Sequence, residues 1–339
     1  MNLAKIALEE AYKHPDDVRD YLANGEQLRQ LAAASGPEAA EWYRDATLRL
    51  ADFDERRLAA MDEHGIDHAV LSLAAPGVQA IVDTGRAVTE ARRQNDFLAE
   101  QIARHPTRFS GFAALPMQDP EPAAAELGRA VGELGFKGAL INGYTNVDDA
   151  EHGRYLDEPV YEQFWAAAVE LGVPVYLHPR PSLPATHAPY AGHPQLRGTA
   201  WGFGTEAATH VLRLIFSGLF DRHPGLRLIV GHLGEGLPAQ LWRTQYNFNL
   251  NPIGKHIEKT LPEYFADNIL VTTSGNFSDQ ALINAILTVG ADNIMFSVDY
   301  PFADTATAAK WIETTPISEK DRRKIANGNA GQLLGIKLS

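Results

Sequence analysis

Eight short and almost continuously apolar segments recur along this chain, and a stretch with helical periodicity follows each of them. The segments span residues 5–11, 68–73, 109–115, 136–142, 173–178, 226–232, 269–274 and 294–299. Continuous apolar runs indicate burial on both faces, which is the condition of strands in a parallel sheet. Right-handed crossovers then place the helices outside the sheet, and eight such units close into an α/β structure of the (β/α)8 TIM barrel type.

A doubly wound open sheet is the alternative arrangement of the same elements. It is disfavoured because no glycine-rich phosphate-binding turn follows the first strand, and because acidic and imidazole side chains recur at strand ends. A length of 339 residues suits one barrel, since such domains run from about 250 residues to beyond 400 with insertions. We therefore expect a single domain over residues 1–339.

Two long segments interrupt the alternation of strands and helices. Residues 11–50 are polar with patchy helical periodicity, and we interpret them as an insertion of one or two helices. This insertion either covers the functional site or forms an exposed subunit contact. Residues 179–204 are rich in Pro, Gly and His, and a loop of this length is usually functional or disordered. We expect it to be an active-site loop.

Composition narrows the class of function. The formal charge is −13 and Lys and Arg are not clustered, so nucleic-acid binding is not expected. The chain has no cysteine, which leaves His, Asp, Glu and water as metal ligands and excludes disulfides and cysteine nucleophiles. We find neither a signal-peptide pattern nor an apolar run of the ~20 residues that a membrane span needs. These features favour a cytoplasmic protein without membrane attachment.

Four of the predicted strands end in side chains that bind metal ions. They are Glu9, His178, His232 and Asp299, on the first, fifth, sixth and eighth strands. The carboxyl ends of barrel strands meet at one mouth, so these residues are expected to converge. Oxygen and imidazole donors suit Mn²⁺, Zn²⁺, Fe²⁺ or Mg²⁺. Each residue alone is better explained as a structural histidine or a capping carboxylate, but four at equivalent positions favour one shared divalent ion.

Two further carboxylates accompany this set. Glu10 alternates to the other side of the strand from Glu9, so we assign Glu9 to the metal and Glu10 to a structural hydrogen bond or ion pair. Glu235 follows His232 by three residues. It either fixes the imidazole tautomer through a hydrogen bond, or caps the helix that begins near Gly236. In the first role it makes His232 an acid–base group beside the metal.

Motifs along nearly the whole chain resemble those of the amidohydrolase superfamily, specifically its non-oxidative aromatic-acid decarboxylases. That group includes the γ-resorcylate (2,6-dihydroxybenzoate), 2,3-dihydroxybenzoate, salicylate and 5-carboxyvanillate decarboxylases. The matching segments are KIALEEA at 5–11, APGVQ at 75–79, FKGALING at 136–143, YLHPR at 176–180, GLFDRHP at 218–224, GHLGE at 231–235, TTSGNF at 272–277 and FSVDYPF at 296–302.

The resemblance implies an amidohydrolase-type barrel in which Glu9, His178 and Asp299 hold one divalent ion. Mn²⁺ or Zn²⁺ is the expected ion, Mg²⁺ is a further candidate, and no organic cofactor is implied. Hydrolases of the superfamily usually carry His-x-His on the first strand, where this chain has Glu9 and Ala11. The γ-resorcylate enzymes often keep a histidine at the second position, so alanine there resembles the 2,3-dihydroxybenzoate and salicylate branch.

The implied reaction is the reversible decarboxylation of an ortho-hydroxybenzoate, which exchanges CO₂ or bicarbonate with a small aromatic acid. In that reaction Asp299 protonates the ring carbon that bears the carboxylate. The resemblance places His232 near the metal or its water, paired to Glu235. It also implies a homodimer or homotetramer.

Three further residues are implied substrate contacts, and each has a plain structural explanation as well. Asn142 and Arg243 would meet a hydroxyl or carboxylate of the substrate, and Phe302 would form a wall against the ring. Alternatively, Asn142 is a turn residue before Gly143, Arg243 makes a salt bridge between subunits, and Phe302 belongs to the core.

Two other functions fit the same barrel. The first is a metal-dependent hydrolase of a lactone, ester or amide, in which His232 or Asp299 activates a metal-bound water. The pair Glu9 and Ala11 argues against the usual two-metal version of such an enzyme, because the second metal would lack ligands. The other is a non-catalytic barrel that only binds a small aromatic acid.

Overall fold

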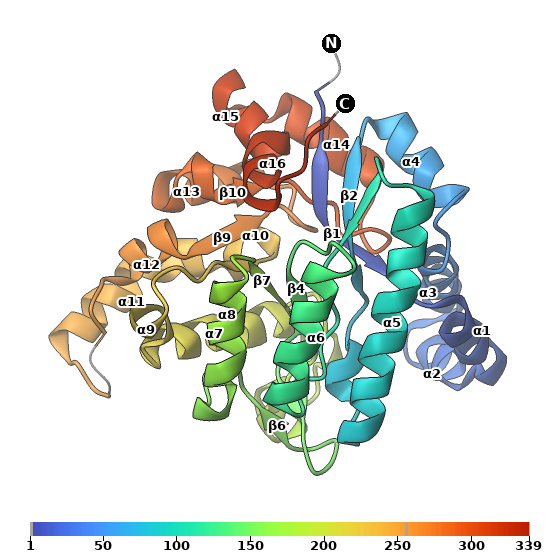
Figure 1. Cartoon of the computed structure of the whole chain (residues 1–339), viewed down its shortest axis with the longest axis horizontal. Coiled ribbons are helices and arrows are strands. Elements are labelled where there is room, and N and C mark those ends of the chain that lie inside the picture. Colours follow the sequence, from blue (N-terminus) through green and yellow to red (C-terminus); the bar gives the residue numbers. More distant parts are fainter. Residues whose placement is uncertain (1–2, 255–256, 339) are drawn as a thin grey trace.

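The computed structural model describes residues 3–254 and 257–338. Its central strands form a ring that is surrounded by helices (Figure 1), which confirms the α/β barrel. The strands of the ring are β1 (Ile6–Tyr12), β2 (His68–Leu73), β3 (Phe109–Gly111), β4 (Ala139–Asn142), β7 (Val175–His178), β8 (Leu228–Val230), β9 (Ile269–Thr272) and β10 (Ile294–Met295).

Parallel ladders join these strands in two groups, β1-β2-β3 and β10-β9-β8-β7-β4. A bridge between Ala113 and Ala139 connects β3 to β4. At the other seam, the backbone N–H of Ala11 donates to the carbonyl of Tyr300 at 2.8 Å. These two contacts close the ring, so the carboxyl ends of all its strands face one mouth.

β3 and β10 are shorter than the predicted segments 109–115 and 294–299. Beyond Met295 the backbone N–H groups no longer bind a neighbouring strand. Phe296 N donates to the Ile325 carbonyl at 2.8 Å, Ser297 N donates to Thr273 Oγ1 at 2.9 Å, and Val298 N donates to Glu10 Oε1 at 2.9 Å. The last predicted strand therefore turns into the site instead of continuing the ladder.

The helices lie outside the ring (Figure 1). Several begin at a side chain that accepts a hydrogen bond from the first turn, as Asp83, Asp119, Ser278 and Asp304 do. The helices of the outer layer are α4 (Arg56–His64), α5 (Thr84–Arg104), α6 (Pro120–Gly132), α7 (Glu162–Glu170), α8 (Gly202–Phe216), α9 (Leu219–Arg222), α11 (Leu237–Leu250), α12 (Leu261–Asp267), α13 (Asp279–Val289), α14 (Thr305–Thr314), α15 (Glu319–Arg323) and α16 (Asn329–Leu334).

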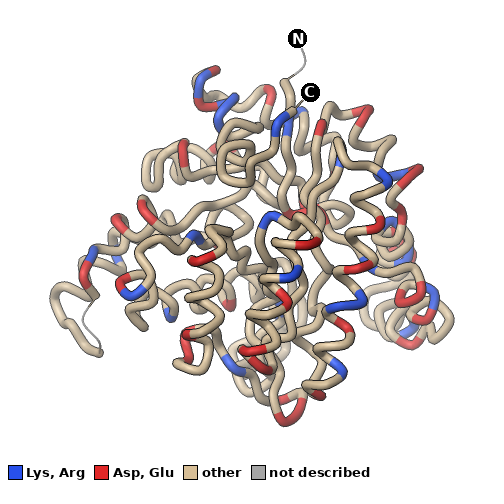
Figure 2. The backbone as a smooth tube through the Cα atoms, viewed as in Figure 1, with Lys and Arg blue, Asp and Glu red and all other residues tan. Residues whose placement is uncertain are grey.

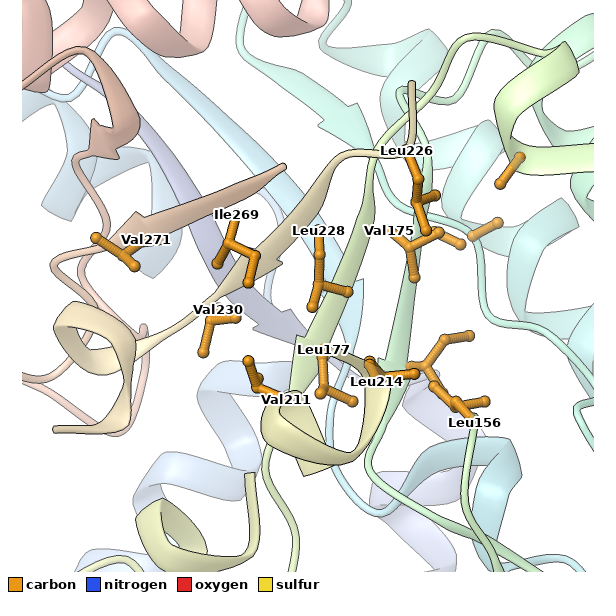
Figure 3. Close-up of a cluster of buried hydrophobic side chains, with 14 of the residues drawn as sticks. Leu156, Val175, Leu177, Val211, Leu214, Leu226, Leu228, Val230, Ile269 and Val271 are labelled. Atoms are coloured by element: carbon orange, nitrogen blue, oxygen red, sulfur yellow. The ribbon is translucent and has the colours of Figure 1, made fainter. Parts of the chain in front are cut away.

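The hydrophobic core has an outer and an inner layer. Outward-facing side chains of β7, β8 and β9 pack with Val211 and Leu214 of α8 (Figure 3). The alternate residues form a smaller cluster inside the ring: Ile6, Leu8, Val70, Phe112, Leu140, Tyr176, Ile229, Leu270 and Met295. Ala330 and Leu334 of α16 join this cluster, so α16 closes the end of the barrel opposite the mouth.

The predicted insertion at 11–50 is helical, but it contains three helices and not one or two. They are α1 (Pro15–Asn24), α2 (Glu26–Ser35) and α3 (Pro37–Leu50). Gly25 and Gly36 separate them with φ of 63° and 92°, a region that glycine reaches without steric cost. The two breaks explain why no single helical period runs through this stretch.

The predicted loop 179–204 is shorter than expected, because α8 already begins at Gly202. Three short 3₁₀ turns shape the rest of it, at Pro184–Thr186, Ala188–Tyr190 and Pro194–Leu196. Between β4 and α7 the chain also makes a small antiparallel hairpin of β5 (Thr145–Asn146) and β6 (Gly153–Arg154), which the sequence did not predict.

Charges of both signs are interspersed over the backbone, without a broad basic region in the view of Figure 2. Among the helices of the described residues, none combines the length and apolarity needed to cross a bilayer.

Candidate metal and acid–base site

A bulge in β1 turns Glu9 toward the inside of the barrel. Ala7 pairs with Ala69 and Glu10 pairs with Leu71, so Leu8 and Glu9 together oppose the single residue Val70. Such a bulge shifts the alternation of side chains by one residue. Leu8 belongs to the inner cluster and Glu9 follows it inward, while Glu10 points to the other side of the strand.

The Glu9 carboxylate is buried among polar side chains of neighbouring strands. The Tyr176 hydroxyl lies in hydrogen-bond contact with Glu9 Oε2 and also with Thr272 Oγ1, at 2.7 Å from the latter. Space for the carboxylate comes from Gly231, where a Cβ atom would lie 2.6 Å from Glu9 Oε2. Glu9 Oε1 is buried and has no hydrogen-bond partner.

His178 and Asp299 complete a three-residue cluster with Glu9. One ligand atom from each of the three lies within 4.8 Å of the others, and His178 Nε2 is 3.3 Å from Glu9 Oε1. Two carboxylates and one imidazole are a donor set for a divalent cation. An unpartnered buried carboxylate oxygen is also costly unless a positive group satisfies it. The residues therefore fit the metal ion that the sequence predicts.

Asp299 reaches this cluster through a strained turn. Its φ is 78°, which side chains rarely adopt, and its carboxylate lies near Gly275, where a Cβ atom would lie 3.1 Å from Asp299 Oδ2. Glu10 accepts hydrogen bonds from the backbone N–H groups of Val298 at 2.9 Å and Tyr300 at 3.2 Å, on both sides of Asp299. This geometry agrees with the expected structural role of Glu10.

His232 lies beside the cluster, and Glu235 orients it. Nε2 of His232 is 3.6 Å from Glu9 Oε1 and 3.8 Å from Asp299 Oδ2, while Nδ1 is 2.7 Å from Glu235 Oε1. Of the two roles considered for Glu235, the structure therefore has the contact to the imidazole. The short segment α10 (His232–Glu235) permits it, because His232 and Glu235 have φ of 52° and 54°.

The two carboxyl groups of the cluster have pKa values that are shifted in opposite directions. Burial raises the pKa of Glu9, but the neighbouring His232 and His178 outweigh it and lower that pKa to about 2. Burial also raises the pKa of Asp299, which the contact with His232 only partly offsets. Burial lowers the pKa of His232, yet Glu235 and Glu9 raise it well above its ordinary value. These shifts favour the ionised form of Glu9 and move Asp299 and His232 toward their protonated forms.

Comparison with known proteins agrees with this arrangement. Residues 14–336 match the family model described as amidohydrolase. The chain belongs to the amidohydrolase family. It is 49% identical to the γ-resorcylate decarboxylase of Polaromonas sp. (strain JS666) over 334 residues, which cover 98% of each chain. The motif resemblance to aromatic-acid decarboxylases is therefore confirmed.

Two solved structures of amidohydrolase-fold decarboxylases match along the full length. One is 2,6-dihydroxybenzoate decarboxylase complexed with 2,6-dihydroxybenzoate, with a TM-score of 0.89, 44% identity and coverage of 99% of both chains. The other is a dihydroxybenzoic acid decarboxylase from Polaromonas sp. JS666 with bound manganese and the inhibitor 2-nitroresorcinol. Its TM-score is 0.90 at 47% identity, covering 99% of this chain and 97% of that one.

The three implied substrate contacts of this amidohydrolase lie in different surroundings. Asn142 is buried inside the barrel beside His178, its partner in the β4–β7 ladder, and its Oδ1 has no hydrogen-bond partner. Phe302 is half-buried, and its ring centre is 6.5 Å from that of Tyr43 on α3. Arg243 is exposed on α11, and no hydrogen bond or ion pair found in residues 3–254 and 257–338 ties its side chain to the cluster.

Sequence reasoning missed several residues that shape the site. Tyr176, Thr272 and Gly231 surround Glu9, although none of them was singled out. Their positions carry a usable signal: Tyr176 lies two residues before His178 on β7, and alternate residues of a strand share a face. The role of Gly231 has no such signal in the sequence. Whether a glycine makes room for a side chain depends on which residue the opposite strand places there.

Proposed function

We propose that this protein catalyses the metal-dependent, non-oxidative and reversible decarboxylation of an ortho-hydroxybenzoate, with 2,6-dihydroxybenzoate as the first candidate. The convergence of Glu9, His178 and Asp299 at the barrel mouth is the observation that carries this proposal. The high identity to γ-resorcylate decarboxylase favours the 2,6-isomer. Ala11 by itself points toward the 2,3-dihydroxybenzoate branch, so both isomers belong in the test.

The three clustered residues would hold one divalent ion, with Mn²⁺ as the first choice because a similar decarboxylase structure contains manganese. When bound, such an ion acts as a Lewis acid and as a template for a substrate hydroxyl and carboxylate. Tyr176 supports this role because its hydroxyl contacts Glu9 Oε2 and is itself held by Thr272 Oγ1, which leaves Glu9 Oε1 directed at the cluster.

Asp299 supplies the proton in the proposed reaction. Burial raises the pKa of this carboxyl group, which favours the protonated form that a general acid requires. The proton passes from Asp299 to the ring carbon that bears the carboxylate, and the ring loses its aromaticity. The carbon–carbon bond then breaks, its electron pair returns to the ring, and CO₂ leaves. Asp299 remains as a carboxylate and takes up a proton for the next turnover.

His232 and Glu235 position and replenish that proton. The Glu235 carboxylate next to Nδ1 fixes the imidazole so that Nε2 faces Asp299 at 3.8 Å. Glu235 and Glu9 hold the pKa of His232 above its ordinary value, which favours the protonated imidazole that can return a proton to Asp299 after each turnover.

The proposed substrate pocket includes two of the three implied contacts, Asn142 and Phe302, but not Arg243 of the same chain. The free Oδ1 of buried Asn142 is an acceptor for a substrate hydroxyl. Phe302 follows Asp299 by three residues, and its backbone N–H donates to the Asp299 carbonyl at 2.8 Å, which keeps the aromatic ring close to the site. The exposed position of Arg243 suits a contact across subunits better than one within this chain.

The test of this function is product formation by Mn²⁺-loaded protein. We expect 2,6-dihydroxybenzoate to yield 1,3-dihydroxybenzene and CO₂, and bicarbonate to drive the reverse carboxylation. The Asp299→Asn variant should bind the substrate and lose turnover. Parallel assays with 2,3-dihydroxybenzoate, salicylate and a panel of lactones include the rival substrates. Lactone hydrolysis without CO₂ release would reject the decarboxylase in favour of the hydrolase.

We also propose that the protein is a homo-oligomer that assembles through α11. Trp242 and Tyr246 stack on the surface of this helix, with ring centres 5.0 Å apart and an angle of 8° between the planes. Leu250 and Ile253 extend the exposed apolar strip, and Trp242 is 73% exposed. Replacing Trp242 and Leu250 by Ser should shift the mass in sedimentation experiments toward the monomer. Leu287→Ser on α13, also exposed, is the matched control.

A further inference from the structure

The carboxyl group of Glu10 makes three polar contacts with the turn that carries Asp299. Its Oε1 accepts from Val298 N at 2.9 Å and lies 3.3 Å from Ser297 Oγ. Its Oε2 accepts from Tyr300 N at 3.2 Å. The two backbone donors immediately precede and follow Asp299, so one carboxylate group brackets that residue from both sides.

Glu10 is itself held in place by burial and by the hydrogen bonds around it. Glu10 is 4% exposed and lies at the end of β1, where Ala11 N donates to Tyr300 O at 2.8 Å. Arg57 secures the same junction: it donates to the carbonyl of Ala11 at 2.7 Å, and its guanidinium lies 4.5 Å from the centre of the Tyr300 ring. The strand that supplies Glu9 and the turn that supplies Asp299 are thereby joined as one unit.

The turn needs such support because its backbone is strained. Asp299 has φ of 78°, a conformation that L residues avoid and keep only where the surroundings over-determine it. In this conformation the carboxylate faces His232 and the Glu9–His178 pair. An extended backbone at this position would send the side chain elsewhere.

We propose that Glu10 is a positioning residue for Asp299, which it holds in the left-handed conformation by accepting the N–H groups of Val298 and Tyr300. Glu10 is not one of the three clustered ligand residues, and its oxygens contact the backbone on both sides of Asp299, so we expect it to act through Asp299. The part of this inference that concerns turnover rests on the proposed decarboxylase function. The part that concerns metal binding does not, because Asp299 belongs to the ligand cluster whatever the reaction is.

Glu10→Gln is the main variant. A glutamine keeps the size and one carbonyl acceptor, but its amide NH₂ group cannot accept the second backbone N–H, so one half of the bracket is lost. Loss of a partner that orients a metal ligand typically weakens metal affinity about 10- to 100-fold. We expect at least a tenfold rise in the Kd for Mn²⁺, measured from the EPR signal of free Mn²⁺ without substrate. At saturating Mn²⁺ we expect kcat to fall at least as far, with KM for 2,6-dihydroxybenzoate nearly unchanged.

Glu126→Gln is the matched control for a purely structural effect. Glu126 is also a buried carboxylate, but it binds Asn95 and Arg129 between α5 and α6. Its replacement should lower the melting temperature and leave the Kd for Mn²⁺ and kcat unchanged. A Glu10→Gln protein that is folded and also keeps both parameters would overturn the proposal.

Glu10→Asp is a second variant, which tests the same role if Glu10→Gln does not fold. Aspartate keeps the carboxyl group and both of its oxygens but is one methylene shorter, so it restores part of the contact with Val298 N and Tyr300 N. We expect its Mn²⁺ affinity and kcat to lie between those of the parent and Glu10→Gln. An unchanged Mn²⁺ affinity in Glu10→Asp, with Glu10→Gln unable to fold, would likewise reject the positioning role. A parent protein that binds Mn²⁺ but decarboxylates nothing would reject the proposed function, while the Mn²⁺ titrations still decide the role of Glu10.

Discussion

At the scale of single residues, backbone strain is concentrated where the chemistry is proposed. Non-glycine residues with positive φ in the described parts of the chain are Asp148, His232, Leu233, Glu235 and Asp299. All except Asp148 belong to the site or to the short segment that carries it. Strained residues of this kind persist only when packing and hydrogen bonds hold them, and they cluster at functional sites. Their position supports the assignment of His232, Glu235 and Asp299 independently of sequence motifs.

Gly231→Ala tests how closely the barrel wall fits Glu9. The added Cβ would lie 2.6 Å from Glu9 Oε2 and 3.3 Å from the Tyr176 hydroxyl, so the carboxylate has to move. We expect at least about a tenfold loss of Mn²⁺ affinity by calorimetric titration, in line with the loss of ligand orientation. Gly128→Ala is the control, because nothing lies within 4 Å of its Cβ and alanine favours the helix. Equal Mn²⁺ affinities of both variants would contradict the proposed ligand role of Glu9.

His210 gives a pH-dependent prediction outside the site. It is fully buried on α8 and its Nε2 accepts from Leu156 N at 3.0 Å, and burial lowers its pKa to about 3. In the unfolded chain the pKa is near 6.5. Between these values the unfolded state binds a proton that the folded state does not, so the free energy of unfolding falls as the pH falls. The slope from this one group is up to about 1.4 kcal/mol per pH unit.

The His210→Gln variant should show a shallower loss of stability between pH 6.5 and pH 4.5 than the parent. Glutamine retains an acceptor for Leu156 N and does not titrate, although the change also costs some stability at pH 7. Urea denaturation at several pH values measures the slopes, with exposed His193→Gln as the control. If the free energy of unfolding has the same pH dependence in the parent and in His210→Gln, His210 is not buried in its neutral form.

At the scale of elements, helix α3 of the insertion packs beside the turn that carries Asp299 and Phe302. Tyr43 of α3 packs near Phe302, and Ala46, Thr47 and Leu50 of the same helix are buried. Of the two roles predicted for residues 11–50, this packing favours a cover for the site.

Tyr43→Ala tests this cover. The variant removes the ring that backs Phe302 but leaves Glu9, His178 and Asp299 in place. We expect a several-fold rise in KM for 2,6-dihydroxybenzoate, with kcat and Mn²⁺ affinity little changed, in steady-state kinetics and metal titration. Arg44→Ala, at an exposed position of the same helix, should leave all three parameters unchanged. A Tyr43→Ala enzyme with unaltered KM would remove α3 from the substrate pocket.

At the scale of the whole molecule, the proposed metal ion joins strands from both parts of the ring. Glu9 lies on β1, His178 on β7 and Asp299 beyond β10, so an ion bound by all three stabilises the closed barrel. A ligand at 100 times its Kd adds about 2.7 kcal/mol to the free energy of unfolding. Exhaustive chelation should therefore abolish turnover and lower the melting temperature, and added Mn²⁺ should restore both.

The control for chelation is the Glu9→Gln variant, whose melting temperature should respond much less to Mn²⁺ in differential scanning fluorimetry. If the parent keeps full turnover after chelation, the metal-dependent mechanism is excluded. If Mn²⁺ stabilises parent and Glu9→Gln equally, the ion binds elsewhere in the molecule.

Much of the architecture could be predicted from local patterns. The apolar segments 68–73 and 269–274 differ from the observed β2 and β9 by at most two residues at either end, because burial on both faces leaves a clear mark in the sequence. The division of the insertion into three helices was not predicted, and Gly25 and Gly36 lie at its two breaks with positive φ. The hairpin β5–β6 was not predicted, as strands of two residues carry almost no signal.

The sequence by itself determined which strand ends carry carboxylates and imidazoles, because strand position follows from apolar runs that neighbouring residues define. Only the tertiary structure decided which of these groups meet. Simple alternation from Ile6 and Leu8 would send Glu10 inward, and the bulge opposite Val70 sends Glu9 there instead. The left-handed turn at Asp299 likewise depends on Glu10 and Tyr300, which are brought together by closure of the ring. Side-chain direction past an irregularity is set by long-range pairing, and no local pattern encodes it.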